Sequence, residues 1–500
     1  MIVCDCFSGE FVLANLYPSD TPPLNLKTMK PFHHLVLLAI GFLSGFTAVG
    51  APNSPPNLIV ILTDDQGYHD VGFNGCKDIP TPNLDSIASN GVRFASGYIS
   101  DPLSSPSRAG LLTGRYQERF GYERNPLWQP NNPDGGLPLT ETTLADALGK
   151  VGYETGIIGK WHLGRNPSLH PLKRGFEEFF GFLGAGHRYL SEELTIEEIR
   201  KAKTDDDSWH LWVMRDDTTI KTTNYLTDEF SDAAVRFIAR QKDQPFFLLL
   251  AYNAPHDPLQ APEKYLNRFP KIQGPHRRTY AAMMSAVDDG VGSVLAELRK
   301  DGLAEQTVVV YLSATGGALD LNSSDNYPLR GTKSSLWEGG CRVPFAMQWP
   351  GHLPKGMIYD QPVLSLDIFA TMAALANAPI SPERPLDGVN LLPYITGQKT
   401  GAPHDAIHLR ISDRGAYAVR SGEYKLVVPA KGQPAELYNL ATDISEFKNL
   451  AAAKPEVVRE LEQKHADWSR QMMSPGPLGT TVSGDPRQID TDAEGLKSKP

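Results

Sequence analysis

The sequence predicts an α/β fold: a large central sheet, mainly parallel or mixed, with helices on both faces, followed by a small α+β domain with an antiparallel sheet. Three continuous apolar runs support this prediction, because such runs are typical of strands buried on both faces of a sheet. They are Leu58–Leu62, Phe246–Leu250 and Val308–Leu312. Helical patterns lie between them, as expected for βαβ units. We place the large domain at residues 52–400 and the small one at 401–474.

The composition is that of a globular protein. Of the 500 residues, 41% are hydrophobic and 21% are charged, which suits one large core and a smaller unit. The net charge of −10 argues against nucleic acid as a partner, because a surface that binds phosphates along a strand is normally basic. Any anion-binding site must therefore be built locally.

The N-terminal region predicts an export signal. Lys30 precedes the apolar run Leu35–Phe46, and the small residues Ala48–Ala51 offer a cleavage point. The run is shorter than the about 20 residues of a spanning helix, so we expect no membrane span after cleavage. Met29 suits the start of such a signal, and residues 1–51 are then an N-terminal extension with a signal peptide. The protein is predicted to be exported, either periplasmic or extracellular.

Cysteine usage leaves one question open. Cys4 and Cys6 would be lost with the N-terminal segment, and the remaining Cys76 and Cys341 may or may not pair. The tail at residues 475–500 is rich in Gly, Pro, Asp and Lys and is predicted to be flexible.

Two adjacent carboxylates, Asp64 and Asp65, follow the first apolar run almost directly. Open α/β sheets build their sites at the carboxyl ends of strands, and hard divalent cations prefer oxygen ligands. The pair is therefore a candidate metal site.

The stretch Asp101–Tyr116 predicts a turn that runs into a helix. Ser105 suits the N-cap and Pro106 suits the first helical position. The free amides and the positive dipole end of this helix would face an anion beside Ser104, and Arg108 adds a positive charge one turn later. A hydroxyl, a helix end and an arginine are thus predicted to meet.

A second group of polar residues follows a predicted strand at Thr155–Ile158, which comes after a helix at Thr143–Val151. Lys160 is a point charge suited to an anion, and His162 can exchange protons near neutral pH. We expect the strand to deliver both side chains to the edge of the sheet.

The middle of the chain combines a loop histidine with structural segments. His256 stands in a proline-rich loop after the second apolar run, and Thr279–Lys300 predicts a long amphipathic helix. The aromatic segment Arg174–Gly186 is expected mainly to pack, with the following His187 as a substrate contact. The acidic stretch Ser191–Thr223 predicts an insertion over the active face that selects the substrate.

The C-terminal part predicts an antiparallel sheet with one helix. Tyr417–Val428 has the pattern of a hairpin around Ser421–Gly422, and a turn-rich strand begins at Glu436. Pro455–Met472 predicts an amphipathic helix, whose inward side chains are Val458, Leu461 and Trp468.

Two long motifs resemble those of the sulfatase family. SSPSRAGLLTGR at Ser104–Arg115 is similar to its nucleophile signature, C/S-x-P-x-R with a trailing L-T-G-R, and GYETGIIGKWH at Gly152–His162 is similar to its second signature. Further matches, arylsulfatase-like and N-acetylgalactosamine-6-sulfatase-like, continue to about residue 470. The resemblance implies that a formylglycine-generating maturation enzyme oxidises Ser104 to formylglycine, whose hydrate attacks a sulfate ester.

The resemblance also implies roles for the other candidate residues, each matched to a family motif. Asp64 and Asp65 would ligate calcium or magnesium, and Lys160 and Lys333 would bind the sulfate. The catalytic set would be Ser104 as the nucleophile, Arg108 to steady its anion, His162 to take a proton from its second hydroxyl and His256 to assist the leaving oxygen.

The chain departs from the family pattern after the third apolar run. Where the family has Asp-Asn as metal ligands, this chain has Ala314 and Thr315. Ala314 cannot ligate a metal through its side chain, so we expect a weakly held metal. Asp320, Asp325 and Asn326 follow in the next loop, and the spacing leaves open whether one of them substitutes.

Three functions remain open from the sequence. The first is a sulfuric ester hydrolase that acts on a sulfated carbohydrate or an aryl sulfate. The second is a degenerate sulfatase that binds sulfated glycans without hydrolysing them, which the missing Asp-Asn pair favours. The third is a phosphatase or phosphodiesterase of the related alkaline phosphatase superfamily, which would use unmodified Ser104 and more metal ligands than the chain offers.

Overall fold

A computed structural model describes residues 55–126, 131–190, 213–241 and 244–475. All of them fall within one compact unit, Ala51–Pro500. The predicted export signal, most of the predicted insertion at Ser191–Thr223 and the predicted flexible tail lie outside the described residues. No helix among the described residues is long and apolar enough to cross a membrane.

A ten-stranded mixed sheet forms the centre of the fold. From edge to edge its strands are β11 (Met357–Tyr359), β2 (Val92–Phe94), β10 (Phe345–Gln348), β9 (Thr307–Ser313), β1 (Asn57–Thr63), β8 (Phe246–Ala251), β4 (Glu154–Lys160), β5 (Glu178–Phe182), β6 (Val213–Arg215) and β7 (Thr218–Ile220). The five strands from β9 to β5 pair in parallel, and β10, β6 and β7 are antiparallel to their neighbours. The predicted fold class is confirmed.

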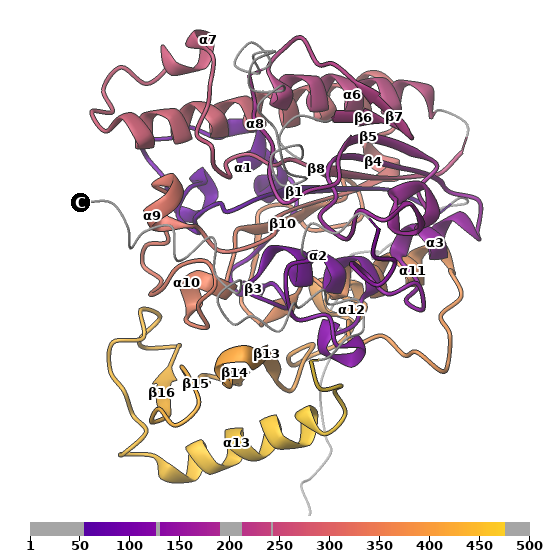
Figure 1. Cartoon of the computed structure of the whole chain (residues 1–500). Helices are drawn as coiled ribbons and strands as arrows, with labels where there is room; N and C mark the ends of the chain where they lie inside the picture. The colour runs from indigo at the N-terminus through magenta and orange to yellow at the C-terminus, as the bar shows by residue number, and fades with distance from the viewer. Residues whose placement is uncertain (1–54, 127–130, 191–212, 242–243, 476–500) are drawn as a thin grey trace, which may run out of the picture. The chain divides into compact units, whose positions relative to one another are not determined.

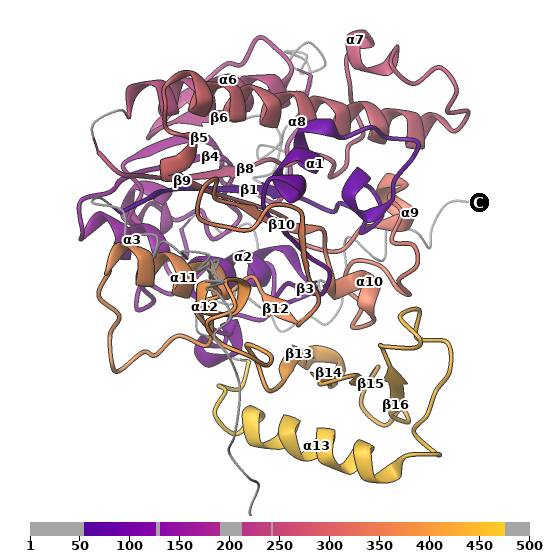
Figure 2. The ribbon, with the colours of Figure 1, turned by 180° about the vertical axis from the view of Figure 1, so that it is seen from behind.

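Helices cover both faces of this sheet, as Figures 1 and 2 show from opposite sides. One face carries α1 (Pro82–Ser89), α6 (Leu226–Arg240) and α8 (Pro275–Lys300), and the other carries α2 (Ser104–Thr113), α3 (Leu144–Gly149) and α11 (Asp367–Ala376). The alternation along β1 explains the two layers: Leu58, Val60 and Leu62 belong to the core under α2, and Ile59 and Ile61 to the core under α8.

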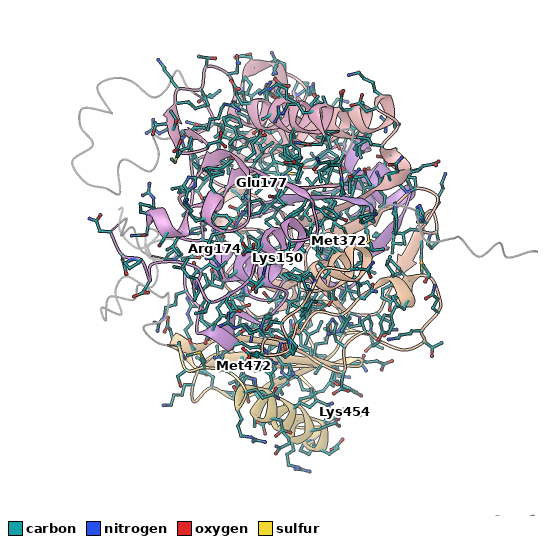
Figure 3. The ribbon with its side chains drawn as sticks, turned by 90° about the vertical axis from the view of Figure 1, so that its right-hand side faces the viewer. Lys150, Arg174, Glu177, Met372, Lys454 and Met472 are labelled. Carbon is teal, nitrogen blue, oxygen red and sulfur yellow. The ribbon has the colours of Figure 1, made fainter. Side chains whose placement is uncertain are left out.

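Short elements connect these layers. They are the two-stranded sheet of β3 (Gly97–Tyr98) and β12 (Val363–Leu364), and the one-turn helices α7 (Glu263–Leu266), α9 (Leu319–Asn322), α10 (Glu338–Cys341) and α12 (Leu392–Ile395). The segment at Arg174–Gly186 packs as predicted. Arg174, labelled in Figure 3, is buried and donates hydrogen bonds to the carbonyl oxygens of Leu137, Pro138 and Glu141.

The C-terminal part of the chain forms the predicted antiparallel sheet and helix. The strands are β13 (Ile407–Ile411), β14 (Ala416–Ser421), β15 (Tyr424–Val428) and β16 (Glu436–Asn439), and α13 (Pro455–Ser469) packs on them (Figure 1). Ser421 pairs with Tyr424, and Gly422 has a φ of 55°, so the hairpin lies where the sequence predicts it. The domain boundary at residue 400 stays a prediction.

Two further expectations can be compared with the structure. Cys76 and Cys341 are both free, so they do not form a disulfide. The long helix α8 begins at Pro275 rather than Thr279, because proline is favourable in the first turn, where its missing N–H is not needed.

Candidate active site

Four neighbouring parallel strands bring the candidate residues to one edge of the sheet. β9, β1, β8 and β4 lie side by side in this order. Ala314 follows β9, Asp64 follows β1, the His256 loop follows β8, and Lys160 ends β4. The carboxyl ends of parallel strands meet at one edge, which is where open α/β sheets bind ligands.

The helix that carries Ser104 begins two residues earlier than predicted. α2 starts at Ser104 with Leu103 at the N-cap, so the assignment of Ser105 as N-cap and Pro106 as first helical residue is wrong. The Ser105 hydroxyl does not cap the helix because it is hydrogen-bonded elsewhere: it donates to the carbonyl oxygen of His162 at 2.5 Å. The Asp101 carboxylate instead holds the preceding turn, accepting the Leu103 N–H at 2.7 Å.

The Ser104 hydroxyl is buried, and it has no hydrogen-bond partner among the described residues. Arg108 lies one turn further on the same face of α2, and its Nη2 is 3.3 Å from Oδ1 of Asp64. Its Nη1 donates to the carbonyl oxygen of Lys160 at 3.2 Å. A buried hydroxyl without a partner thus faces the same region as an arginine bound to a carboxylate.

Asp64 is fully buried between two positive charges. Lys160 Nζ lies 2.5 Å from Asp64 Oδ2, and Arg108 contacts the other oxygen. Burial alone would raise the pKa of Asp64, but Lys160 and Arg108 outweigh burial and hold this pKa well below its usual range. Burial lowers the pKa of Lys160 to about 8, although Asp64 opposes the change.

His162 lies in the same group of charges. Burial lowers the pKa of its imidazole, and the positive charges of Lys160 and Arg108 lower it further. Its Nδ1 is buried and has no hydrogen-bond partner in the described part of the chain. A neutral imidazole with an available nitrogen can accept a proton.

Asp65 is held by a network of its own. Its backbone has a φ of 61°, and its N–H donates to Thr315 Oγ1 at 3.2 Å while the same hydroxyl donates to Asp65 Oδ1 at 2.7 Å. Lys333 Nζ lies 2.9 Å from Oδ2, and His256 Nε2 lies 3.6 Å from the same oxygen. Asn322 fixes the backbone by donating to the Asp65 carbonyl oxygen at 2.9 Å.

The His256 ring is oriented by its own loop. Nδ1 lies 2.7 Å from the carbonyl oxygen of Asp257, which can only accept, so Nδ1 carries the hydrogen in this contact. Nε2 is therefore the nitrogen that faces Asp65 and the site.

For a divalent cation the donor set fits only in part. Ligand atoms of Asp65, His256 and Asp257 lie within 4.8 Å of one another, so a candidate metal-binding group exists. Ala314 is buried beside them with only a methyl group, and the Thr315 hydroxyl is already bonded to Asp65.

The three loop residues left open as substitutes have other positions or contacts. Asp320 is exposed, and the Asp325 carboxylate lies 2.9 Å from His69 Nδ1. The Asn326 side chain braces the loop: it accepts the N–H of Gly317 at 3.1 Å and donates to its carbonyl oxygen at 3.1 Å. In the part of the chain that the structure describes, none of these contacts involves Asp64 or Asp65.

Contacts or electrostatic interactions connect seven of the eight site residues that the sequence singles out, namely Asp64, Asp65, Arg108, Lys160, His162, His256 and Lys333. The eighth, Ser104, lies one turn before Arg108 on α2. His187, the predicted substrate contact, is buried against Phe182 with ring centres 5.1 Å apart, and its role stays a prediction. Sequence reasoning missed the contacts of Thr315 and Asn322 with Asp65. For Thr315 the sequence offered one signal, a hydroxyl at a position where the family has a metal ligand. For Asn322 it offered no signal.

Comparison with known proteins identifies the family. The family model described as Sulfatase matches residues 56–378, and a model of the N-sulphoglucosamine sulphohydrolase C-terminal region matches residues 332–471. N-acetylgalactosamine-6-sulfatase of Mus musculus is 33% identical, over 87% of this chain and 82% of that protein. Human arylsulfatase A is 32% identical, over 82% of this chain and 87% of that protein.

Solved structures agree with this result. The crystal structure of Ps i-CgsB in complex with k-i-k-neocarrahexaose superimposes with a TM-score of 0.81 at 36% identity, over 86% of this chain and 96% of that one. PsFucS1 sulfatase from Pseudoalteromonas sp. shares the fold, with a TM-score of 0.72 at 24% identity, over 83% and 90% of the two chains. The chain belongs to the sulfatase family and is a hydrolase of that family.

Proposed function

We propose that this protein hydrolyses sulfate esters of a sulfated carbohydrate, with a formylglycine made from Ser104 as its nucleophile. The observation that carries the proposal is the Ser104 hydroxyl, which is buried at the start of α2 without a hydrogen-bond partner among the described residues and one turn from Arg108. A carbohydrate substrate is supported by the relatives, because one is named for N-acetylgalactosamine 6-sulfate and one was solved with a neocarrahexaose.

The formylglycine hydrate would supply two hydroxyls on one carbon, so that one forms the new S–O bond and the other allows sulfate to be expelled with the aldehyde restored. Arg108 and Lys160 would stabilise the negative charge that develops on the attacking oxygen. His162 would accept the proton of the second hydroxyl, because its lowered pKa keeps the imidazole neutral.

Lys333 and His256 act on the other side of the sulfate. Lys333 would bind a sulfate oxygen from its position beside Asp65. His256 would donate its Nε2 proton to the leaving carbohydrate oxygen as the S–O bond breaks, and Asp65, 3.6 Å away, would stabilise the imidazolium before this transfer.

Asp64 and Asp65 would hold a calcium or magnesium ion, whose charge would offset that of the sulfate oxygens. Their present neighbours are cationic: three basic side chains, Arg108, Lys160 and Lys333, contact these two carboxylates. We therefore propose that the ion is weakly held and that Arg108, Lys160 and Lys333 carry most of the sulfate binding.

A second candidate is a protein that binds sulfated glycans without hydrolysing them. It is favoured by Ala314 and by the Thr315 hydroxyl, which is bonded to Asp65. A phosphatase that uses unmodified Ser104 is less well supported, since it needs a metal to activate the hydroxyl and the donor set is poor.

Two assays on the same preparation separate these functions. Mass spectrometry of the peptide that contains Ser104 gives its maturation state, and sulfate release from sulfated oligosaccharides gives the activity. We expect release only from protein with the aldehyde, and none from Ser104→Ala. Tight oligosaccharide binding by matured protein without sulfate release would instead support the second candidate, and release by protein with plain serine would refute the formylglycine step.

A further inference from the structure

The segment that carries Lys333, residues 330–342, is held by the C-terminal sheet. Arg330 Nη1 donates to Tyr438 Oη at 2.8 Å and to the carbonyl oxygen of Glu446 at 3.1 Å. Trp337 Nε1 adds a third contact, because it donates to the Glu436 carboxylate at 2.9 Å. The segment is thus fixed at several points to residues about 100 positions later in the chain.

The centre of this contact is a fully buried group of one ammonium and two carboxyl groups. Lys425 Nζ on β15 lies 2.8 Å from Glu338 Oε1 and 3.1 Å from Glu446 Oε1, and the Glu338 N–H donates to Glu446 Oε2 at 2.7 Å. Burial would raise the pKa of Glu338, but Lys425 and Arg342 outweigh burial and lower this pKa to about 2. We call Glu338, Lys425 and Glu446 the buried triad.

The same segment meets the candidate active site on its other side. The Ser334 N–H donates to the carbonyl oxygen of Pro102, in the turn before α2, at 3.2 Å, and the Lys333 N–H donates to that of Gly317 at 3.0 Å. The Lys333 side chain then reaches Asp65 Oδ2 at 2.9 Å. A shift of this segment would move Lys333 and the turn before Ser104 together.

Buried charges restrict the positions that such a segment can adopt. A buried polar or charged group that loses its partner is strongly destabilised, so the arrangement that pairs all three side chains is preferred over displaced ones. Glu338 and Lys333 are five residues apart on the same segment. Fixing Glu338 therefore fixes the start of the Lys333 side chain.

We propose that Lys425 is a positioning residue of the sulfate site: through the buried triad it sets the place of Lys333, so that the C-terminal sheet takes part in sulfate recognition without touching the substrate. This inference rests on the proposed function, because it assigns sulfate binding to Lys333. It makes sulfate binding depend on the buried triad, whose three residues lie outside the candidate active site.

The test removes the whole triad rather than one partner. Lys425→Met alone leaves Glu446 without its cation and Glu338 with only Arg342, and it can unfold the protein. Replacing all three side chains of the buried triad by neutral ones of similar volume is often tolerated, and Arg342 keeps its hydrogen bond to the carbonyl oxygen of Ala95. The variant is Glu338→Gln/Lys425→Met/Glu446→Gln. The control is Lys464→Met, which removes a lysine–aspartate pair with the exposed Asp405 on the surface.

Two measurements are compared with wild type. Amide hydrogen exchange should become faster in residues 330–342 of the triple variant, and not in the control. The KM for a sulfated oligosaccharide, or the Kd for inorganic sulfate, should rise about tenfold or more, with a smaller change in kcat. Loss of a residue that positions a binding group typically lowers the affinity by about 10–100-fold. The three substitutions remove one lysine and two carboxyl groups, of which Glu338 is ionised, so they take away no net positive charge. Long-range electrostatics alone would therefore not weaken sulfate binding.

The outcomes distinguish this inference from the proposed function. Unchanged exchange in residues 330–342, or faster exchange with unchanged sulfate affinity, overturns the positioning role of the buried triad. Wild-type protein that neither binds sulfate nor hydrolyses the ester counts against the proposed function. In that case too, the exchange measurement decides whether the buried triad holds the segment.

Discussion

At the scale of single residues, two hydrogen bonds from one side chain hold Asp65 in place. Thr315 both accepts from and donates to Asp65, and these bonds support the unusual backbone conformation of Asp65. Lys333 provides the positive charge next to the same carboxylate.

Restoring the ligands should restore metal affinity. We expect Ala314→Asp with Thr315→Asn to tighten calcium binding by about 10³-fold, because two ligands are gained and each outer partner alone is worth about 10–100-fold. Asp should contribute more, since it also adds a negative charge. Titration calorimetry with calcium measures the change, with Thr315→Ser, which keeps the hydroxyl, as the control. Micromolar calcium binding by the native protein that the double substitution does not improve would contradict this expectation.

Glu118 should make stability depend on pH. It is fully buried, neither carboxylate oxygen has a hydrogen-bond partner among the described residues, and burial with the nearby Glu123 and Asp101 raises its pKa well above the usual value, against the effect of Arg410. Because folding raises the pKa of Glu118, the protonated side chain contributes stability that is complete at pH values below the pKa of Glu118 in the unfolded chain. It is lost as the pH rises through the folded pKa.

Glu118→Gln removes this dependence, so it should stabilise the protein at pH 8 by about 1.4 kcal/mol for each unit by which folding raises the pKa of Glu118, and change the stability little at pH 4. Chemical denaturation at both pH values measures the free energy of unfolding. Glu462→Gln, at an exposed position on α13, serves as the control. An equal effect at both pH values would show that Glu118 is not protonated preferentially in the folded state.

At the scale of elements, the sequence is most informative where a local pattern decides the structure. The apolar runs predict β1, β8 and β9 because strands buried on both faces need no alternation, and the polar residues after them follow from strand direction. The start of α2 was misjudged because the Ser105 hydroxyl bonds to His162, 57 positions away. The contact of Thr315 with Asp65 spans 250 positions, which no local pattern encodes.

The anchoring of α1 on α8 gives a prediction for these two helices. Asp288 of α8 accepts the backbone N–H of Asn83 at 3.0 Å and of Leu84 at 2.8 Å, in the first turn of α1. Asp288→Ala should lower the free energy of unfolding by about 1–3 kcal/mol, because it leaves these amides without their acceptor. The neighbouring Asp289 pairs with exposed Arg268, so Asp289→Ala should lower the free energy of unfolding far less. Urea titration of both variants and of the wild type measures this difference.

At the scale of the whole molecule, ion pairs join the C-terminal sheet to the α/β part. Besides the buried triad, Arg410 on β13 pairs with buried Glu123, and Arg124 pairs with Asp413, which lies between β13 and β14. Breaking a buried pair is strongly destabilising, so the two parts should depend on each other for stability.

We therefore expect the described parts of the chain to unfold in a single transition. Differential scanning calorimetry should give a calorimetric enthalpy equal to the van't Hoff enthalpy, and near-ultraviolet and far-ultraviolet circular dichroism should change at the same temperature. Two separated transitions would mean that the C-terminal sheet is an independent folding unit.

The burial of α2 bears on the order of folding and of any modification of Ser104. Every residue of this helix is buried, including Ser104, so an enzyme that oxidises the Ser104 side chain cannot reach it in the folded protein. Under the proposed function, the modification would therefore have to come before the helix packs. Folded protein with plain serine, incubated with an active maturation enzyme, should remain unmodified by mass spectrometry, while an unstructured peptide of residues 100–116 should be converted. Folding before modification would then leave the chain permanently without its nucleophile, so the rate of folding competes with the rate of maturation.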